Sequence, residues 1–377
     1  MLFFSVSLGK KDVLVADEKI CLVRDHIEGY EGLDGVEVFD LTGKTLVPGY
    51  IDMHVHITGG GGEGGFTTRV PEAQLSIFVK NGISTALGLL GTDGVTRSLE
   101  NLVAKAQALT EEGMTVYTLT GSYAYPSVTL TGSIEKDIVM VRPMVGVKIA
   151  VSDHRGDNPS GEDLIDAAVA ARRGGLLSGT AGLVTIHMGG GKGKLDPIFY
   201  ALDHSDLPLK TLLPTHMLYS WDLLNEGIKL IRRGGYIDCS TPSVESRLEE
   251  KADMMIELLR TEGVTADHVS MSSDSFGSLP RFDKNGQYIG MIYASPEYMH
   301  KMIRCMAQKG LPLEEALKLV TTTPASLLCL DGKKGCIAEN ADADLLVLDE
   351  DLNIESFFLR GKTALWKGEV KMKGRFE

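Results

Sequence analysis

The sequence predicts an α/β fold, a (β/α)8 barrel of the TIM type joined to a small β-sandwich domain that is built from both chain termini. Eight apolar runs alternate with helical stretches, a pattern typical of βαβ units that form a parallel sheet. These runs spread over about 230 residues, close to the roughly 250 residues of such a barrel. At the two termini, short apolar runs and tight turns replace this alternation, which favours a separate β-structure there.

The expected barrel strands are the apolar runs, and the expected helices are the amphipathic stretches between and after them. The strands lie at 45–57, 83–90, 114–120, 145–151, 183–188, 211–215, 236–239 and 268–273. The helices lie at 70–81, 97–112, 160–174, 222–233, 243–263, 296–309 and 312–328. The connection at 192–205 is less regular, and 124–144 is a long insertion with little helical periodicity.

The two chain ends are expected to form one small β-domain. Each fragment is too short to bury a core alone, so the two should complete a single unit. The predicted domains are therefore 1–48 with 340–377, and 49–339 for the barrel. The short runs that predict strands lie at 12–15, 20–23, 36–40, 343–348, 354–359 and 364–366.

The composition excludes several classes of partner. With 43% hydrophobic and 24% charged residues, the 377-residue chain has the balance of a soluble globular protein. Its net charge of −13 argues against nucleic acid or an anionic membrane as a partner. The apolar start is too short for a signal peptide, and no run reaches the ~20 residues of a membrane helix. Five scattered cysteines without a Cys-x-x-Cys pair favour a reducing compartment, so we expect a cytoplasmic protein.

One stretch, 49–65, carries the main chemical signal. His54 and His56 end an apolar run and share one face of the expected strand, in line with Asp52. Imidazole is the commonest metal ligand, and two from one strand supply half of a coordination shell. A glycine-rich loop that contains Glu63 follows. For an isolated His-x-His the alternative is a strand whose histidines make local hydrogen bonds, but the glycines and the later histidines favour metal.

Other polar residues also fall where predicted strands end, which is where barrels of this type carry their chemistry. A purely structural role would scatter such residues along the elements. Lys148 lies inside the apolar strand 145–151, and Asp153, His154 and Arg155 come just after that strand. The residues that end or follow the other strands are Thr92, Tyr123, His187, His216 and Asp274.

The donor set points to a divalent transition metal, because four histidines and one aspartate suit zinc. Five protein ligands are too many for one catalytic zinc, which suggests two metals about 3.5–4 Å apart. A bridging group is then needed. Lys148 would supply it if CO2 converted the amine to a carbamate, and the alternative is an ordinary lysine held by a salt bridge.

These residues, placed between two terminal β-fragments, resemble the amidohydrolase superfamily and, more narrowly, its isoaspartyl (β-aspartyl) dipeptidases. The resemblance covers nearly the whole chain. It implies a metal-dependent hydrolase of small β-aspartyl dipeptides, with two Zn²⁺ per subunit and a CO2-derived carbamate on Lys148. It also suggests a homo-oligomer such as an octamer. The motifs that carry it lie at 59–63, 89–93, 120–123, 146–148, 152–155, 187–189, 213–216 and 272–274.

The resemblance further implies a role for each catalytic group. Asp274 would accept the proton of a metal-bridging hydroxide as it attacks the amide carbon, and would then deliver that proton to the leaving amine. Tyr123, with a metal, would stabilise the oxyanion. The implied ligands are His54, His56 and Asp274 for one zinc, His187 and His216 for the other, and Lys148 between them.

For the substrate, the resemblance implies that Glu63 pairs with the free α-ammonium group and Arg155 with a carboxylate. Gly61, Thr92 and Ser278 would add hydrogen bonds to the dipeptide. Simple structural alternatives remain open for the two charged residues. Glu63 would then be a solvated loop charge, and Arg155 would form an ion pair with a neighbouring aspartate, either Asp153 or Asp157.

One departure from the family concerns the substrate. Family members carry a second arginine three residues after the strand-6 histidine, where this chain has Tyr219, which bears no charge. The alternative function keeps the chemistry and changes the substrate to a cyclic amide such as dihydroorotate, or to an N-acyl amino acid. Glu63 argues against it, because those substrates lack a free α-amine. A non-catalytic relative is a third hypothesis, disfavoured because every expected metal position is filled.

Overall fold

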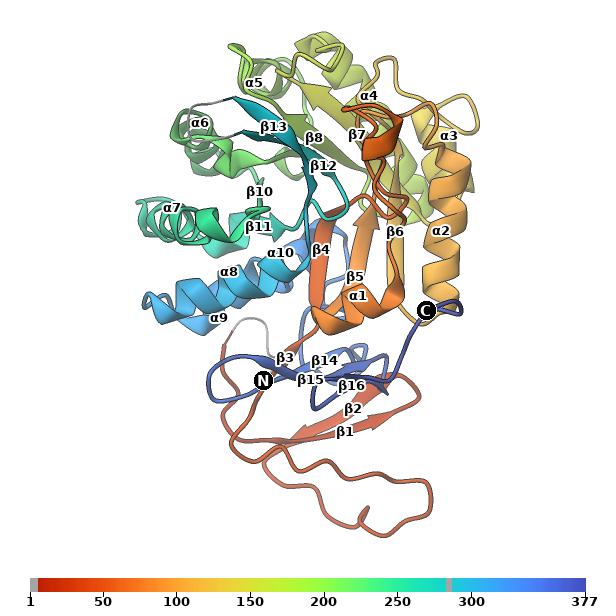
Figure 1. The fold of residues 1–377 in the computed structure, drawn as a ribbon, viewed down its shortest axis with the longest axis vertical. Coiled ribbons are helices and arrows are strands. Elements are labelled where there is room, and N and C mark those ends of the chain that lie inside the picture. Colours follow the sequence, from red (N-terminus) through yellow and green to blue (C-terminus); the bar gives the residue numbers. More distant parts are fainter. Residues whose placement is uncertain (1–5, 283–286) are drawn as a thin grey trace.

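The centre of the computed structural model, which describes residues 6–282 and 287–377, is a parallel sheet of six strands in sequence order (Figure 1). Two further strands, β10 (Ile237–Ser240) and β11 (Val269–Ser272), pair with each other in parallel. The strands of the six-stranded sheet are β4 (Tyr50–Val55), β5 (Ile83–Gly88), β6 (Thr115–Gly121), β7 (Met144–Val151), β8 (Leu183–Met188) and β9 (Leu212–Thr215). All eight match predicted strands, which confirms the expected barrel.

Side chains and one backbone contact close the barrel where the ladders stop. Between β9 and β10 the hydroxyl of Thr215 donates to the Oδ2 of Asp238 at 2.7 Å. At the seam, the N–H of His56 donates to the carbonyl of Ser275 at 2.9 Å, and Val55 forms a parallel bridge with Ser275. The carboxyl end of β4 therefore lies beside the segment that follows β11.

Helices cover the barrel strands much as the periodicity predicts. One difference is that the single helix expected over 312–328 is two, because Pro324 has no N–H and its ring clashes with a preceding carbonyl. The irregular stretches 124–144 and 192–205 contain the short helices α3 and α5. The helices are α1 (Leu75–Lys80), α2 (Leu99–Glu111), α3 (Ile134–Met140), α4 (Gly161–Ser178), α5 (Asp196–Asp203), α6 (Trp221–Arg232), α7 (Leu248–Arg260), α8 (Glu297–Gln308), α9 (Leu313–Lys318) and α10 (Thr322–Leu327).

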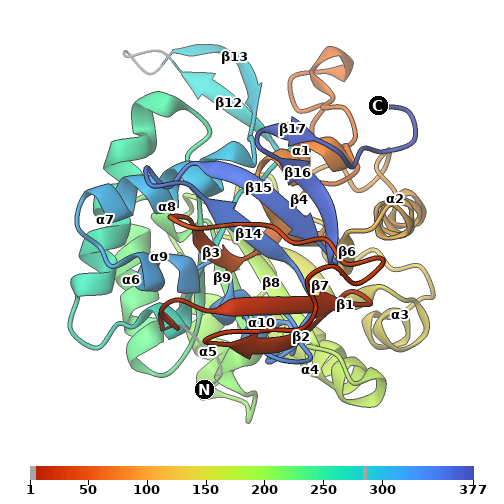
Figure 2. The same ribbon diagram turned by 90° about the horizontal axis from the view of Figure 1, so that it is seen from below.

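Strands from both chain ends meet below the barrel (Figures 1 and 2). An antiparallel hairpin of β1 (Asp12–Ala16) and β2 (Lys19–Arg24) packs its apolar side chains against a five-stranded sheet. The order of that sheet is β17-β16-β15-β14-β3. Its strands are β3 (Thr45–Pro48), β14 (Leu345–Leu348), β15 (Ile354–Leu359), β16 (Lys362–Trp366) and β17 (Glu369–Val370). The two layers form the expected sandwich, while the boundaries of the two domains stay a prediction.

The strand expected at 36–40 is wrong, because these residues form no strand. Their anchor is one aromatic side chain. The ring of Phe39 lies 4.9 Å, between centroids, from both Phe358 and Trp366. Packing of a single ring holds the segment against the sandwich without any backbone ladder.

The apolar run 45–57 proves to be two strands, separated at Gly49. The N–H of Gly49 donates to Asp344 of the small sheet, and the next N–H, of Tyr50, donates to Gly82 beside the barrel, both at 2.8 Å. A Cβ at Gly49 would lie 2.9 Å from the Cβ of Ser84 and 3.1 Å from the ring of Phe357. Glycine therefore allows one chain segment to change sheets within a single residue.

A hairpin formed by β12 (Ser278–Phe282) and β13 (Tyr288–Tyr293) was not predicted from the sequence. Pro280 within the first strand hides the pattern, since proline normally argues against a strand. In Figure 1 the hairpin lies at the end of the barrel opposite the small sheet, where the barrel strands end. Among the described residues, no helix combines the length and apolarity that a bilayer crossing requires.

Candidate active site

Four predicted ligands converge where β4, β9 and β11 end. The Nε2 atoms of His54 and His56 lie 3.5 and 3.1 Å from the Oδ1 of Asp274. The ring of His216 is centred 4.7 Å from that of His54. One donor atom each from His54, His216 and Asp274 lie within 4.8 Å of one another, so this group could hold a metal ion. The fold thus brings together His54 and Asp274, which are more than two hundred positions apart in the sequence.

Local backbone geometry aims two of these side chains inward. His216 and Asp274 have φ values of 66° and 53°, in the left-handed region that non-glycine residues seldom adopt. Each residue starts a tight turn, since Tyr219 donates to the carbonyl of His216 at 2.9 Å and Gly277 to that of Asp274 at 3.0 Å. Such strain costs about 1–3 kcal/mol per residue and clusters at functional sites.

Lys148 lies on β7 inside the barrel and is fully buried. Its Nζ is 2.9 Å from the Nε2 of His54, so its near partner is an imidazole rather than a carboxylate. Burial lowers the pKa of Lys148 to about 7, although Asp274 opposes the shift. The position and the pKa both suit an amine that reacts in its neutral form.

His187 lies in the same cluster, with its ring centred 4.6 Å from that of His216. Its Nε2 is 2.8 Å from the Oδ2 of Asp153, and its Nδ1 is 2.6 Å from the hydroxyl of Tyr123. Burial lowers the pKa of His187 to about 4, against the opposing contact with Asp153. Tyr123 is therefore held against a predicted ligand, with Arg155 over its ring, 5.4 Å from the centroid.

Two oppositely charged side chains, Glu63 and Arg155, lie beside this cluster. The Oε2 of Glu63 accepts from the Nη1 of Arg155 at 3.1 Å, and its Oε1 accepts from the hydroxyl of Thr92 at 2.5 Å. Glu63 is thus a paired residue rather than a solvated loop charge. Arg155 also binds Asp153 through two nitrogens, at 3.0 and 2.8 Å, which is the ion pair that the sequence left open.

Gly61 and Ser278, the remaining predicted substrate residues, are in contact. A Cβ at Gly61, where φ is 93°, would lie 2.9 Å from the Cβ of Ser278. Ser278 begins β12 and is 8% exposed, and its Oγ has no hydrogen-bond partner among the described residues. The glycine loop and the hairpin therefore meet at a buried hydroxyl.

Sequence reasoning missed the contacts that hold His187, His216 and Asp52 in place. Asp153 contacts His187, Ser240 lies 2.6 Å from the Nδ1 of His216, and Ser273 donates to the buried carboxylate of Asp52. A signal was present for Asp153. It follows β7, which pairs with β8, so its side chain had to emerge beside His187. The next residue, His154, has a side chain that is 89% exposed.

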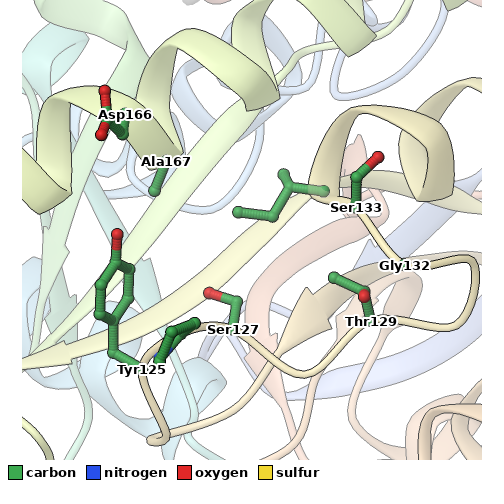
Figure 3. Close-up of a pocket in the computed structure, with 9 residues that line it drawn as sticks. Tyr125, Ser127, Thr129, Gly132, Ser133, Asp166 and Ala167 are labelled. Atoms are coloured by element: carbon green, nitrogen blue, oxygen red, sulfur yellow. The ribbon is translucent and has the colours of Figure 1, made fainter.

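A cavity of about 240 Å³ lies elsewhere, between the segment after β6 and helix α4 (Figure 3). Its walls include Tyr125, Ser127 and Asp166, and they contain none of the predicted site residues. It therefore adds nothing to the histidine cluster.

The donor chemistry of the cluster fits a divalent metal. Burial holds the pKa of His54 and of His216 well below the ordinary value, so both imidazoles keep a free lone pair. Burial alone would raise the pKa of Asp274, but His216 and the contact with His56 hold it below its usual range. Neutral imidazoles around an ionised carboxylate are the ligands that zinc prefers.

A sequence model of the amidohydrolase family matches residues 45–365, from the edge of the small sheet to its fourth strand. The chain belongs to the amidohydrolase family. The match covers every predicted ligand, so the cluster lies in the region that defines the family.

This amidohydrolase is also similar to solved structures over nearly its whole length. One is the β-aspartyl dipeptidase of Fervidobacterium islandicum AW-1 in complex with the dipeptide β-Asp-Leu, at 40% identity and a TM-score of 0.89, covering 97% of this chain and 94% of that one. The D-hydantoinase of Bacillus sp. AR9 matches 98% and 95% of the two chains with a TM-score of 0.68, but at 14% identity it shows the fold alone.

Relatives found by sequence comparison match only short stretches of this chain. A dihydroorotase of Listeria monocytogenes serotype 4a is 36% identical over 110 residues, which are 28% of this amidohydrolase and 24% of the relative. An adenine deaminase of Oceanobacillus iheyensis is 31% identical over 99 residues, 24% and 15% of the two chains. The chain thus spans about a quarter or less of the length of these curated relatives.

Proposed function

We propose that this amidohydrolase is a dinuclear zinc peptidase that hydrolyses β-aspartyl dipeptides. The pairing of Glu63 with Arg155 at 3.1 Å, beside the histidine cluster, carries the proposal. A β-linked aspartyl residue keeps a free ammonium and a free carboxylate on one carbon atom. Adjacent anionic and cationic side chains match those two groups, and a charge-assisted bond to each would fix the residue in one orientation. The dipeptide bound to the Fervidobacterium enzyme has the same chemistry.

The metal-binding part of the proposal rests on the donor set. His54, His56 and Asp274 would hold one zinc ion, and His187 and His216 the other, with Lys148 as a carbamate between them. When bound, zinc polarises a carbonyl oxygen and lowers the pKa of water, which makes amide hydrolysis feasible near neutral pH. The convergence of His54, His56 and Lys148 on one buried region supports this assignment.

Asp274 is proposed as the group that moves protons. Its low pKa keeps it ionised at neutral pH, ready to accept a proton from the attacking water. The same oxygen would then return the proton to the leaving amine, which cannot depart as an anion. Its Oδ1 lies 3.1 Å from the Nε2 of His56 and 3.5 Å from the Nε2 of His54, so its orientation is fixed before the substrate arrives.

Tyr123 is proposed to stabilise the oxyanion. Burial raises the pKa of Tyr123 well above the ordinary value, so its hydroxyl remains a donor at all working pH values. Ser278 and Thr92 would orient the aspartyl residue, Ser278 through its unpartnered hydroxyl and Thr92 through its bond to Glu63. Gly61 would contribute its backbone, since a side chain there would fill the space beside Ser278.

A cyclic amide such as dihydroorotate is the second candidate substrate, favoured by the local match to dihydroorotases. It has one carboxylate and no free amine, so Arg155 would have a partner and Glu63 would not. Glu63 would keep its contacts with Arg155 and Thr92 but would receive no ammonium group from such a substrate, so one charge-assisted contact would be missing from the binding energy.

The test compares hydrolysis of β-Asp-Leu, α-Asp-Leu, dihydroorotate and N-acetyl-leucine by enzyme loaded with zinc in the presence of bicarbonate. We expect turnover of β-Asp-Leu alone. Glu63→Gln should raise KM for that substrate about 10- to 100-fold, the range for a lost charged hydrogen bond. Rapid turnover of dihydroorotate with β-Asp-Leu untouched would overturn the substrate assignment.

We also propose that the enzyme is a cytoplasmic homo-oligomer. The five cysteines, all of which the structure describes, form no disulfide, which suits a reducing compartment. Light scattering during gel filtration would test the assembly. A mass near 40.8 kDa would contradict it.

A further inference from the structure

The carboxylate of Asp153 contacts both a proposed metal ligand, His187, and a proposed substrate-binding residue, Arg155. Its Oδ2 lies 2.8 Å from the Nε2 of His187 and accepts from the Nη2 of Arg155, also at 2.8 Å. Its Oδ1 accepts from the Nε of Arg155 at 3.0 Å and from the backbone N–H of the same residue at 2.8 Å. These four contacts use the four acceptor directions of a carboxylate, and the side chain is only 4% exposed.

The backbone is arranged to bring this carboxylate to His187. Ser152, just before it, has a left-handed φ of 55°. The side chain of Asn158 clamps the turn, because it accepts from the N–H of Asp153 at 2.9 Å and donates to its carbonyl at 2.7 Å. Gly189 completes the approach, since a Cβ there would lie 2.6 Å from both Cα and Cβ of Asp153. Only glycine lets the end of β8 come so close.

The contact decides where the proton of His187 sits. A neutral imidazole carries one N–H and one lone pair, and an ionised carboxylate can only accept. Nε2 of His187 therefore carries the N–H toward Asp153, and the lone pair stands on Nδ1. The hydroxyl of Tyr123, 2.6 Å from Nδ1, donates to that lone pair. A carboxylate on the far nitrogen fixes the tautomer and the ring orientation of imidazole ligands in metal sites.

We propose that Asp153 is a positioning residue that serves both parts of the site at once. It fixes the tautomer of His187 that offers Nδ1 to a metal, and it holds the guanidinium of Arg155 where the Nη1 reaches Glu63. The metal and substrate consequences rest on the proposed function, whereas the tautomer is a property of the metal-free chain. One buried carboxylate then couples metal affinity to substrate affinity although it touches neither ligand.

The first test measures the tautomer in metal-free protein labelled with ¹⁵N-histidine, with the signals of His187 assigned through His187→Gln. Wild-type protein should show the Nε2–H form. In Asp153→Asn the amide can donate to Nε2, so the Nδ1–H form should appear. An unchanged tautomer in this variant overturns the proposal. Gly189→Ala keeps every side chain of the site but displaces the turn, and it should cause the same change if Asp153→Asn fails to fold.

The second test measures zinc binding and KM. Wild-type enzyme should bind two zinc ions per subunit, and Asp153→Asn should keep one and bind the second about 10- to 100-fold more weakly. Its KM for β-Asp-Leu should also rise. Two tightly bound zinc ions in this variant would overturn the positioning role. Wild-type protein that binds no zinc would overturn the proposed function instead, and the tautomer would still decide the role of Asp153.

Arg155→Lys is the matched control. It keeps a cation beside Asp153 and leaves the contact with His187 intact, but it loses the planar fork that reaches Glu63. We expect both zinc ions and the wild-type tautomer to remain while KM rises. Loss of a zinc ion from this variant would show that Arg155, and not Asp153, governs the ligand, and would overturn the proposal.

Discussion

The Nζ of Lys148 lies 2.9 Å from the Nε2 of His54, with both side chains withdrawn from solvent. Because burial lowers the pKa of Lys148 to about 7, much of the amine is neutral at pH 7–8, and a neutral amine adds to CO2. Lys148→Met should therefore abolish zinc binding and lower activity by at least about 10³-fold, since it would remove the proposed bridging ligand. Enzyme prepared with ¹³C-bicarbonate should show a carbamate signal that this variant lacks.

Another buried lysine provides the control for that experiment. Lys251 is 6% exposed, and its Nζ donates to the carbonyl of Leu218 and lies 3.6 Å from the sulfur of Met254. Its ion-pair partner is Glu250, 3.8 Å away and outside the histidine cluster, so Lys251→Met should keep both the zinc and the carbamate signal. A ¹³C signal that survives in Lys148→Met but disappears in Lys251→Met would place the carbamate on Lys251 and contradict the assignment to Lys148.

Replacement of Tyr123 by Phe isolates its hydroxyl. Loss of one oxyanion donor typically lowers kcat about 10²- to 10³-fold, and this is the expected effect on β-Asp-Leu hydrolysis. Zinc content should be unchanged, because the ring of Phe keeps its place against His187. Tyr125→Phe is the matched control, since that hydroxyl donates to the carbonyl of Asp163, away from the cluster. Equal losses in the two variants would exclude a specific role for Tyr123.

Tyr219 is expected to limit recognition of the leaving residue. It is 63% exposed on the turn that starts at His216, and its ring lies against Gly190, whose Cβ would be 3.2 Å from the hydroxyl. A neutral phenol cannot form the charged fork that an arginine offers a carboxylate. Tyr219→Arg should lower KM for β-Asp-Leu about tenfold, equivalent to 1.4 kcal/mol. The amide β-Asp-Leu-NH2 should gain nothing, and an equal gain for both substrates would contradict this role.

The stability of the fold should depend on His300 at acidic pH. Its Nδ1 lies 2.8 Å from the hydroxyl of Tyr50 and its Nε2 lies 2.7 Å from the carbonyl of Leu352. Burial lowers the pKa of His300 from 6.5 to about 4. The unfolded chain therefore binds a proton below about pH 6.5 that the folded protein rejects, and stability falls as pH drops from 6.5 toward 4.

This dependence can be measured by urea unfolding of wild type and His300→Gln at pH 7.5 and pH 4.5. Glutamine does not titrate, so the variant lacks this source of acid sensitivity. The difference in unfolding free energy should shift in favour of the variant by about 2–3 kcal/mol between the two pH values. A constant difference would show that His300 accepts a proton without cost in the folded protein.

The barrel strands, and the strand ends where the proposed ligands lie, could be predicted from the sequence, because parallel strands are apolar over their whole length and end abruptly. His54, His187, His216 and Asp274 each stand at such an end, so the fold alone brings them together. Strand periodicity holds for 45–57 as well, yet it cannot show that Gly49 passes the chain from one sheet to the other. That change depends on hydrogen-bond partners at Gly82 and Asp344, far along the chain.

The contacts between charged side chains could not be predicted. Arg155 is as close in sequence to Asp157 as to Asp153, and only the turn clamped by Asn158 decides between them. Glu63 lies more than ninety residues before Arg155 in a loop whose glycines allow many paths. Its pairing depends on loop conformations that no local pattern encodes. The β12–β13 hairpin was not predicted either, because Pro280 interrupts the strand pattern.

The junction at Gly49 links the histidines of β4 to strands that follow all of the proposed ligands in the chain. β3 finds its ladder partner only in β14, and β14 in turn pairs with β15, near the carboxyl terminus. A ribosome that has released all six proposed ligands still holds the residues that anchor the first strand of the barrel. The histidine cluster can therefore reach its final form only after residues 345–348 have been synthesised, and a chain that stops before them would carry every proposed ligand without the strand that pairs with β3.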